Sequence, residues 1–534
     1  MDEIRLAILG FGSANRALAR MLLEKSEPSS SSSSSSCSSS PDDRKNNNST
    51  TPRRNRRNCR NLRVPIANSN TTRLVPWKVV CIITRSHGRV CIPLSSSSLS
   101  SSIGEDDESY EIDLEGALER VESGQLLDDT SLVIPSQEHL PATTTTTATT
   151  TDDDDHERNS IAETLNLLRL LGKTKTANIL VEAIPSNPKG NCEPVLSFLT
   201  KAISSKLHVV SANKSPLAHT RTNTRTNIHA DAHSDNQKVE TYWTLQQLAH
   251  ANNVMYNHES AVMDGVPIFS LWKYTLPYAK LISLRGCLNS TTTMILTRME
   301  ERGGSSSSRS SRSGGSDTSG TTAIEGETFE EALAAAKHMG IVEEDDSLDL
   351  DGYDAAVKLR ALLVYCSSSS SSSEAGIDHD AVVPSMEQIH RDSIRNITRE
   401  DVRCAYANGR RKYRLVASAR LVADDVPLDT LGGLGDDTRA KQLGLGNAAT
   451  ATATTKDNGS TTKNKWEASV RLQLLLPSDP LYNLSGTDSS IQFCTDVLGP
   501  VTVVSSNPTL VDTAYGLLSD IVRVASESQR DGGA

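Results

Sequence analysis

Carboxylate side chains and one lysine gather between Gly340 and Lys358, and they are the residue types in this chain most suited to chemistry. Asp354 and Lys358 are four residues apart, so a helix would place both on one face. Glu343 and Asp349 precede them and offer oxygen acceptors to an amino group or a hydroxyl. The alternative is a solvated acidic loop with a surface Asp–Lys pair, which contributes little to stability. The rest of the chain favours the functional cluster.

The N-terminal residues show the order of strand, turn and helix that is typical of a dinucleotide-binding unit. An apolar run over residues 6–9 ends at Gly10 and Gly12, which allow a tight turn and let a pyrophosphate approach a helix N-terminus. Asn15 stands where the third glycine of this fingerprint is expected. Apolar residues then recur at helical spacing, at Ala17, Leu18, Met21 and Leu22. The predicted cofactor contacts of this turn are Gly10, Phe11, Gly12, Ser13 and Ala14.

Strands and helices then alternate along the first part of the chain. A buried second strand is predicted at 77–84, a third at 178–182, a helix at 193–204 and a fourth strand at 208–211. This alternation predicts a parallel sheet that binds its ligand at the carboxyl edge of the strands. Lys214 follows the fourth strand and should lie at that edge.

Arg85 lies at the tip of the predicted second strand. Dinucleotide folds often end this strand in a carboxylate that binds the ribose 2′-OH, whereas an arginine suits a 2′-phosphate. The sequence therefore favours NADP over NAD, with NAD as the alternative. An exposed arginine on an ordinary loop is an equally simple interpretation.

Polar low-complexity tracts interrupt the 534 residues. Serine or threonine dominates many of them, including 29–40, 94–102, 143–151, 305–311 and 367–373. Because these tracts have too little apolar content to offset chain entropy, we expect disordered insertions between folded elements. The remaining residues suffice for two interleaved domains.

Charge and cysteine content argue against several classes of protein. A net charge of −11 disfavours general nucleic-acid binding. The arginines between Arg53 and Arg63 are interpreted as part of a solvated loop in the first insertion, in preference to a nuclear signal or an RNA contact. The nine cysteines contain no Cys-x-x-Cys pair, which argues against a zinc site or a disulfide framework and suits a reducing compartment.

No apolar stretch reaches membrane-spanning length. The first strand begins at residue 4, which leaves no room ahead of it for a signal or transit peptide. We therefore expect a cytoplasmic protein with neither a membrane nor a nucleic acid as partner.

Four separate blocks of the chain resemble homoserine dehydrogenase in their order and internal spacing. These blocks are His208–Leu217, Glu259–Pro267, Gly286–Thr292 and Gly340–Lys358. Towards the C-terminus, 479–486 and 499–520 resemble the closing strands and helix of that family. Agreement among independent blocks makes the resemblance specific, although each block alone would be weak.

The resemblance implies a reversible, NAD(P)-dependent reduction of L-aspartate 4-semialdehyde to L-homoserine, in the biosynthesis of threonine, methionine and isoleucine. It implies an α/β fold with a Rossmann-type nucleotide-binding domain and a second α/β domain for catalysis and dimerisation. The expected partners are therefore a small-molecule substrate and a second copy of the chain. The chain is similar to the monofunctional form, in which no kinase or regulatory domain is expected.

Transferred to this chain, the resemblance implies a nucleotide-binding domain at 1–237, a catalytic and dimerisation domain at 238–490, and a segment at 491–534 that returns to the first domain. Disordered insertions are expected in the first domain at about 26–76, 93–110, 141–158 and 219–237. Those of the second domain are expected at about 303–322, 367–380 and 425–465.

The resemblance also implies roles for the residues around the substrate. Lys358 matches the family's acid/base lysine, and Asp354 matches its carboxylate neighbour. Glu343 matches the residue that binds the substrate amino group, and Asp349 matches a further acidic residue of the substrate site. Lys214 matches the lysine between the nicotinamide and the substrate. A lysine suits this chemistry because the alkoxide formed from an aldehyde needs a proton and nearby positive charge.

Cofactor and metal contacts follow from the same resemblance. Ile184 and Gly340 match further positions beside the cofactor. Glu259, together with backbone carbonyls, matches a sodium site, for which oxygen ligands are suitable; its alternative role is that of a strand-end carboxylate. The residues whose carbonyls would take part are Val262, Asp264 and Val266.

Several residues depart from the family pattern. Asp346 replaces a usual proline, Thr293 a usual asparagine and Ile184 a common threonine, while 507–509 replaces a Gly-Ala-Gly turn. Because several changes, including Asn15, touch the cofactor side, the alternative function is a catalytically weak nucleotide-binding paralogue with a regulatory or scaffold role. Another amino-acid dehydrogenase of the same fold would not be expected to keep the whole acidic cluster with its lysine. The retained acids and lysines favour the active dehydrogenase.

Overall fold

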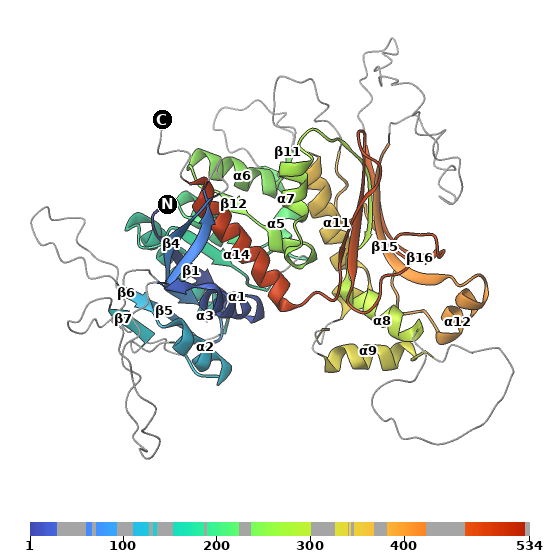
Figure 1. Ribbon diagram of the computed structural model, residues 1–534, viewed down its shortest axis with the longest axis horizontal. Coiled ribbons are helices and arrows are strands. Elements are labelled where there is room, and N and C mark those ends of the chain that lie inside the picture. The colour runs from blue at the N-terminus through green and yellow to red at the C-terminus, as the bar shows by residue number, and fades with distance from the viewer. Residues whose placement is uncertain are drawn as a thin grey trace, which may run out of the picture. The chain divides into compact units, whose positions relative to one another are not determined.

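A computed structural model describes part of the chain in two compact units (Figure 1). Unit 1 comprises Met1–Ser270 and Pro508–Ala534, and unit 2 comprises Leu271–Asn507. Each unit contains a β-sheet of its own. The described residues are 1–28, 60–66, 71–92, 110–127, 132–135, 153–185, 189–223, 237–300, 326–339, 341–342, 346–367, 382–422 and 465–528.

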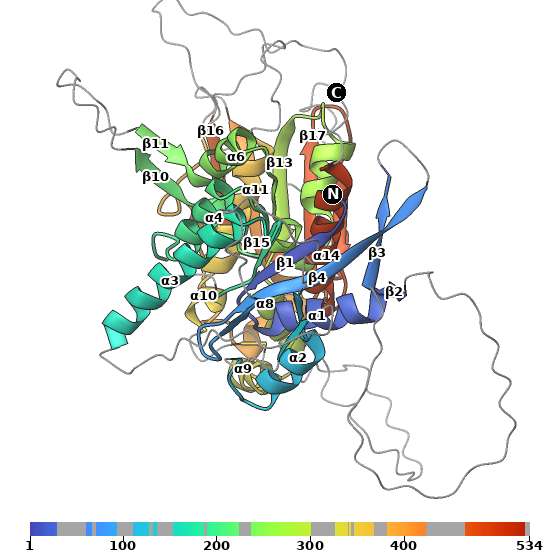
Figure 2. The ribbon, with the colours of Figure 1, turned by 90° about the vertical axis from the view of Figure 1, so that its left-hand side faces the viewer.

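Unit 1 is built on a sheet that, in the described residues, has eight strands in the order β12-β9-β8-β1-β4-β3-β2, with β5 paired to β4. Apolar residues fill its central strands and are buried, as expected for a parallel sheet covered on both faces. The parallel strands are β1 (Ile4–Leu9), β4 (Thr72–Ile83), β8 (Ile179–Glu182), β9 (His208–Ser211) and β12 (Tyr256–Asn257). Antiparallel strands β2 (Glu27–Pro28), β3 (Arg60–Pro65) and β5 (Arg89–Cys91) extend the sheet, and Figure 2 shows β1 and β3 on either side of β4.

Helices connect these strands and bury their apolar faces in the same unit. α1 (Ser13–Lys25) packs on α14 (Leu510–Glu527), so the first and last helices of the chain lie together. α3 (Asp153–Lys173) contacts α4 (Val195–Ser204), and α4 contacts α6 (Thr241–Ala251). The remaining helices include α2 (Leu114–Glu122), α5 (Ser215–Ala218) and α7 (Ile268–Ser270). Two short antiparallel pairs complete the unit, β6 (Tyr110–Ile112) with β7 (Val133–Pro135) and β10 (Thr220–Asn223) with β11 (Gln237–Glu240).

Two glycines allow the C-terminal helix to approach the rest of unit 1 closely. Gly265, at φ +86°, and Gly516, on α14, come so near each other that a Cβ atom on Gly516 would lie 2.7 Å from the Cα atom of Gly265. A Cβ atom on Gly265 would meet the carbonyl oxygen of Asp512 at 2.4 Å. Side chains at either glycine would therefore force the helix away from the fold.

The described strands and helices correct several expected insertion limits. β2 and β3 lie within the expected insertion 26–76, and Arg60 and Arg63 belong to β3 rather than to a solvated loop. The reason is that Leu62 and Val64 alternate with polar residues and bury their side chains while β3 pairs with β4. The start of α3 at Asp153, strand β10 and the first residue of β11 likewise fall inside expected insertions. The remaining parts of those tracts, including most of 303–322, 367–380 and 425–465, lie outside the described residues.

Unit 2 has a mainly antiparallel sheet, six-stranded in the described residues, in the order β14-β16-β15-β13-β17-β18. Its strands are β13 (Leu281–Cys287), β14 (His390–Arg391), β15 (Lys412–Val422), β16 (Lys465–Leu475), β17 (Ser489–Thr495) and β18 (Val501–Ser505). The helices are α8 (Ser290–Glu300), α9 (Phe329–His338), α10 (Ser347–Leu350), α11 (Tyr353–Cys366) and α12 (Arg399–Ala407). β15 contacts α8, α11 and α12, so the sheet supports the helices that follow β13.

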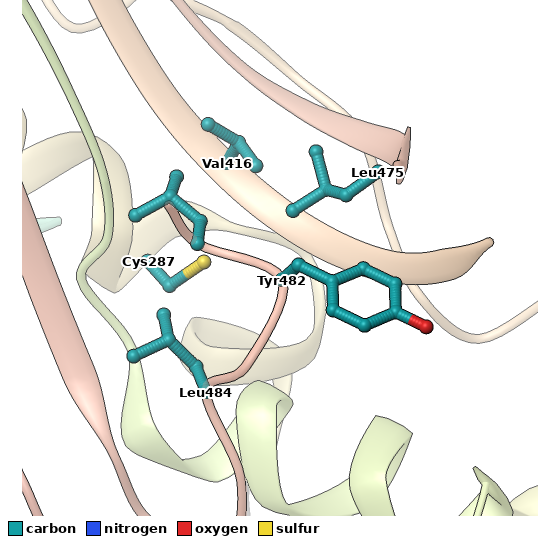
Figure 3. Close-up of a cluster of buried hydrophobic side chains, with 6 residues drawn as sticks. Cys287, Val416, Leu475, Tyr482 and Leu484 are labelled. Carbon is teal, nitrogen blue, oxygen red and sulfur yellow. The ribbon is translucent and has the colours of Figure 1, made fainter. Parts of the chain in front are cut away.

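A cluster of buried side chains anchors one end of this sheet to the loop that precedes β17 (Figure 3). Its members are Cys287, Val416, Leu475, Leu481, Tyr482 and Leu484. Arg414 is fully buried nearby, where it pairs with Glu300 at 2.6 Å and donates to the carbonyl oxygen of Leu484 at 2.7 Å. These contacts fix the end of β13, from which the chain enters the loop before α8.

The units divide the chain at other positions than the expected domain limits of 237/238 and 490/491. The first boundary lies between Ser270 and Leu271, and the return to unit 1 begins at Pro508. The second difference has a clear cause, because β17 pairs with β13 and β18 pairs with β17. Residues 491–507 therefore belong to the sheet of unit 2.

Candidate active site

Asp354 and Lys358 lie on one face of α11, as their spacing predicted. The helix begins after Gly352, whose φ of 69° turns the chain between α10 and α11. Lys358 Nζ lies 2.9 Å from Asp354 Oδ2. The side chains are only 17% and 9% exposed, so the alternative of a solvated surface pair is wrong.

The carbonyl oxygen of Leu288 is the second partner of the lysine, accepting from Lys358 Nζ at 2.9 Å. This carbonyl belongs to the loop between β13 and α8, whereas Asp354 belongs to α11. Two separate elements of unit 2 therefore hold the ammonium group. A lysine held at two points in a half-buried site is well placed to lend a proton to a neighbouring oxygen.

Asn289 joins the two acidic residues of this cluster. Its side-chain amide nitrogen donates to Asp349 Oδ1 at 2.7 Å and to Asp354 Oδ2 at 3.0 Å. Its side-chain oxygen accepts from the backbone N–H of Thr292 at 2.9 Å, which fixes the orientation of the amide. Because one donor group serves both carboxylates, it reduces their mutual repulsion.

Asn289 and the Leu288 carbonyl had no role in the sequence prediction. Both lie in the Gly286–Thr292 block, directly after the buried strand β13, but a block of this kind does not say which side chain points at which acid. Thr291 adds a weaker contact, from its hydroxyl to Asp349 Oδ2 at 3.4 Å. Thr293, one of the departures from the family pattern, is buried and bonds to the carbonyl oxygen of Asn289 at 3.2 Å.

Two predicted residues of the acidic segment, Gly340 and Glu343, lie outside the described residues. Asp346, which replaces a usual proline, is described and accepts hydrogen bonds from Lys337 and Arg395. The bond from Lys337, followed by that from Arg395, holds the pKa of Asp346 below its usual value. Asp346 therefore anchors the start of α10, and with it Asp349, to neighbouring cations.

The turn after β1 has the geometry expected of a dinucleotide-binding loop. Gly10 has φ +81°, and a Cβ atom there would lie 2.7 Å both from the carbonyl oxygen of Ala183 and from Ile184 Cγ2. Gly12 precedes α1, and a Cβ atom on it would point into open space. Phe11 is buried, while Ser13 and Ala14 open the helix. The first turn of α1 contains no acidic residue, so its N-terminus suits a pyrophosphate.

Asn15 takes a structural role in place of the missing third glycine. Its side chain is fully buried, and its amide nitrogen donates to the carbonyl oxygens of Leu9 and Gly10. These bonds tie the start of α1 to the end of β1. Asn15 therefore replaces the close helix–strand packing of a glycine with side-chain hydrogen bonds, and the turn is preserved.

Arg85 is exposed in the short turn between β4 and β5. Thr84 shapes this turn, since its hydroxyl bonds to Gly88 and accepts from the backbone N–H of His87, each at 2.8 Å. The carbonyl oxygen of Ile83 accepts from the N–H of Gly10 at 2.8 Å, so the turn lies beside the glycine loop. Arg85 is therefore at the edge of the sheet where a dinucleotide presents its ribose.

A buried network joins the ends of β8 and β9, where Ile184 and Lys214 are found. Glu182 is completely buried and accepts from the hydroxyl of Ser211 and from the N–H of Ile184. Burial raises the pKa of this carboxyl above its usual value, while these hydrogen bonds act in the opposite direction. Asn213 extends the network from Ser211 to the carbonyl oxygen of Ile184. Glu182 was missed by sequence reasoning, although an acid within a buried apolar strand is itself a signal.

Glu259 is buried, but its described contacts are not those of an open cation site. Oε1 accepts from the N–H of Phe269 at 2.9 Å, and Oε2 accepts from the N–H of Ser270 at 3.0 Å and from its hydroxyl. Arg523 lies 3.7 Å from Oε2. Burial raises the pKa of Glu259. A sodium ion would have to share these oxygens with three donors and a cation, so the fit is poor.

The carbonyl groups expected to complete that site lie in a tight turn. Met263 and Asp264 both have positive φ, and the carbonyl oxygen of Val266 accepts from the N–H of Ile268 at 2.7 Å. Among the described residues, no three His, Cys, Asp or Glu side chains gather as a group that could hold a metal ion. No helix in the described part of the chain is long and apolar enough to span a membrane.

Comparison with known proteins gives one consistent family. A family model described as homoserine dehydrogenase matches residues 267–522. The NAD(+)-dependent homoserine dehydrogenase of Pseudomonas canavaninivorans is 26% identical over 354 residues, which are 66% of this chain and 72% of that protein. The homoserine dehydrogenase of Sulfurisphaera tokodaii is 24% identical and covers 65% of this chain and 76% of its own length. That of Methanocaldococcus jannaschii is 32% identical over 187 residues, which are 35% of this chain and 42% of that protein.

Solved structures share the fold. A putative homoserine dehydrogenase from Archaeoglobus fulgidus matches with a TM-score of 0.52 at 17% identity, over 98% of this chain and 99% of that one. A hyperthermophilic archaeal homoserine dehydrogenase in complex with NADPH matches with a TM-score of 0.52 at 20% identity, over 98% of each chain. The sequence likenesses, with the Lys358 cluster in the matched region, all indicate homoserine dehydrogenase, an oxidoreductase.

Proposed function

We propose that this chain interconverts L-aspartate 4-semialdehyde and L-homoserine and that Lys358 handles the proton of the substrate oxygen. The observation that carries the proposal is the fixed ammonium group, 2.9 Å from both Asp354 Oδ2 and the Leu288 carbonyl oxygen. A nicotinamide dinucleotide supplies the hydride when bound. The glycine loop, the open space above Gly12 and the N-terminus of α1 fit such a cofactor.

In the reducing direction, the aldehyde oxygen gains negative charge as its carbon becomes tetrahedral. Lys358 offsets that charge and donates a proton to the oxygen, and in the reverse direction it accepts the proton from the hydroxyl. Asp354 keeps the ammonium group in place. Asp349 and Glu343 are proposed to bind the substrate's polar groups, with Glu343 taking the amino group. Lys214 is proposed to lie between the nicotinamide and the substrate, and Ile184 and Gly340 to border the cofactor.

The test is direct oxidation of homoserine by the purified protein with NADP or NAD, followed by the absorbance of the reduced nicotinamide. Steady turnover that depends on homoserine is expected. Cofactor binding without turnover would instead support the weak nucleotide-binding paralogue. The ordered lysine–carboxylate pair argues against that paralogue, because a scaffold protein has no need to keep a half-buried lysine between two elements.

Asn289→Ala should lower kcat by roughly tenfold or more, because Asp349 and Asp354 lose the donor that holds them together and the lysine loses its alignment. Steady-state kinetics with homoserine and cofactor at saturating concentrations is the measurement. Thr297→Val is the matched control, since it removes a buried hydrogen bond of 2.7 Å from α8, the helix that follows Asn289, without touching an acid. Equal kinetic effects of both substitutions would contradict a specific role for Asn289.

We infer that the cofactor is NADP. Arg85 beside the glycine loop supports this choice, because a guanidinium can bind a 2′-phosphate through charge-assisted bonds. One solved relative is described in complex with NADPH, whereas another relative is named NAD(+)-dependent, so the family includes both. NAD is therefore the alternative cofactor.

Arg85→Ala should raise the KM for NADP by roughly tenfold or more while changing that for NAD little, because only NADP carries the phosphate. Parallel titrations of the two cofactors with homoserine held saturating would measure the difference. Arg20→Ala serves as the control, since Arg20 is an exposed arginine of α1 that pairs with Glu122. An equal loss for both cofactors would show that Arg85 does not read the phosphate.

Three further expectations remain predictions. Sodium at Glu259, Val262, Asp264 and Val266 is one, and the contacts of Glu259 with Arg523 and Ser270 do not support it. A homodimer is the second, supported by β18, which is an edge strand among the described residues, and by Val504, Leu474 and Leu476, which are more than one-third exposed. Analytical ultracentrifugation would measure whether the chain forms a dimer.

A cytoplasmic location is the third expectation, and fluorescence microscopy of the tagged full chain would test it.

A further inference from the structure

Cys81 and Cys91 face each other across the hairpin of β4 and β5. The strand register pairs them directly, in the order Cys81↔Cys91 and Ile82↔Val90. The backbone bonds Ile92 N–H to Val80 O, at 3.0 Å, and Thr84 N–H to Gly88 O, at 2.9 Å, lie on alternate pairs of this ladder. The cysteine pair therefore falls on a non-hydrogen-bonded position, where cross-strand side chains are closest.

The two thiols differ in access to solvent. Cys81 is fully buried, and its hydrogen bond with Cys91, together with burial, holds its pKa well above the usual value. Cys91 is half-buried. On the same face, Arg89 lies two residues before Cys91 and pairs with Glu163 of α3 at 2.8 Å. A soluble oxidant would thus reach Cys91 before it reaches the buried Cys81.

Other described cysteines do not share this arrangement. Cys192, Cys287 and Cys366 are buried, and Cys404 is exposed on α12. Cys287 lies opposite Ser490 and Cys494 lies opposite Ser283, whereas Cys192, Cys366 and Cys404 belong to none of the described strands. The pair could not be predicted from the sequence, because nine residues separate Cys81 from Cys91 and only the strand pairing brings them together.

We propose that Cys81 and Cys91 are a redox-active dithiol that closes reversibly to a disulfide and thereby weakens NADP binding at the Arg85 turn. With a peroxide as oxidant, the thiolate of Cys91 attacks one peroxide oxygen and becomes a sulfenic acid, while the other oxygen leaves as water after protonation. The Cys81 sulfur then attacks the sulfenic sulfur, its proton is lost, and the hydroxyl leaves as a second water. Two thiols and one peroxide thus give one disulfide and two waters. A dithiol reductant reverses the reaction by exchange.

The effect on the cofactor follows from geometry and rests on the proposed role of Arg85. A disulfide brings Cβ atoms to roughly 3.8 Å, closer than the roughly 4.5–5.5 Å of an ordinary cross-strand pair. Closing it draws β4 and β5 together directly beneath the turn that runs from Thr84 to Gly88. Because Arg85 lies in that turn, its guanidinium shifts relative to the glycine loop, and contact with a 2′-phosphate weakens.

The test is to treat the full-length protein with hydrogen peroxide, block free thiols, and map peptides without reduction. Trypsin cleaves after Lys78, Arg85 and Arg89, so Cys81 and Cys91 fall on separate peptides that stay joined only through a disulfide. We expect a linked peptide of 79–85 with the peptide that begins at Val90, lost after dithiothreitol. The KM for NADP should rise by roughly tenfold on oxidation and recover on reduction.

Cys91→Ser should abolish both the linked peptide and the change in KM, whereas Cys404→Ser should leave both intact. Absence of the linked peptide while Cys404 becomes oxidised would overturn the dithiol. A linked peptide with an unchanged KM for NADP would overturn its action on the cofactor. Arg85→Ala separates this inference from the proposed function: if Arg85 does not read the phosphate, NADP binding by that variant is unimpaired before any oxidant is added.

Discussion

Lys358→Ala is expected to lower kcat by roughly 10²-fold or more while the affinity for the cofactor stays close to that of the wild type. The substituted protein lacks the group that gives the substrate oxygen its proton. It also lacks the positive charge that offsets the developing alkoxide. Steady-state kinetics in both reaction directions, together with cofactor titration by fluorescence, would measure the two effects separately.

Two variants control for trivial causes. Lys337→Ala removes another lysine that pairs with an aspartate, Asp346, at 2.8 Å, but this lysine is 41% exposed and Arg395 still holds Asp346, so turnover should hardly change. Lys358→Arg keeps a positive charge beside Asp354 but gives up its proton far less readily, so it should restore thermal stability without restoring kcat. Wild-type turnover in Lys358→Ala, with the fold intact by thermal melt, would eliminate the proposed proton transfer.

Gly10→Ala should abolish useful cofactor binding and also lower the stability of unit 1. The new methyl group would meet the carbonyl oxygen of Ala183 and Ile184 Cγ2, both at 2.7 Å, in a backbone conformation with φ +81°. The left-handed conformation alone costs roughly 1–2 kcal/mol for a residue with a Cβ atom. Isothermal titration with NADP and thermal unfolding are the two measurements.

Gly12→Ala is the matched comparison on the same loop. A Cβ atom there meets nothing within 4 Å, and the residue has an extended backbone at φ −76°, so stability should fall by less than roughly 1 kcal/mol. The methyl group would still occupy the space through which a pyrophosphate approaches, so NADP binding should weaken at least tenfold. Unchanged binding in Gly12→Ala would show that the cofactor does not approach this glycine.

Parallel strands of unit 1 were predictable because each is a short apolar run that ends in polar residues. The predicted strands at 178–182 and 208–211 correspond to β8 and β9, and the predicted helix at 193–204 corresponds to α4. Strand β3 could not be predicted in the same way, because arginines and low-complexity sequence surround it. Leu62 and Val64 are buried because β3 pairs with β4, and the sequence alone does not indicate that pairing.

The same distinction applies to the candidate site. Asp354 and Lys358 could be linked from sequence because a helix fixes the distance between residues four apart. The contacts of Asn289 could not be, since they join residues 60 and 65 positions away along the chain. Helical periodicity carries no information about such distant partners. The side-chain packing of Glu182 and the pairing of Cys81 with Cys91 belong to the same class, because both depend on which strands become neighbours.

Because α14 belongs to unit 1, this unit cannot finish folding on the ribosome until α14 has been synthesised. Strand β1 and helix α1 are made first, but α14, which packs on α1 and buries Leu517, Ile521 and Val524, is made last. The nascent nucleotide-binding unit must therefore wait, with part of its apolar surface uncovered, while all of unit 2 is synthesised. Unit 2, whose residues are contiguous, can fold as a unit before α14 is made. Chaperones that bind exposed apolar surface should thus engage the early part of this chain for most of its translation.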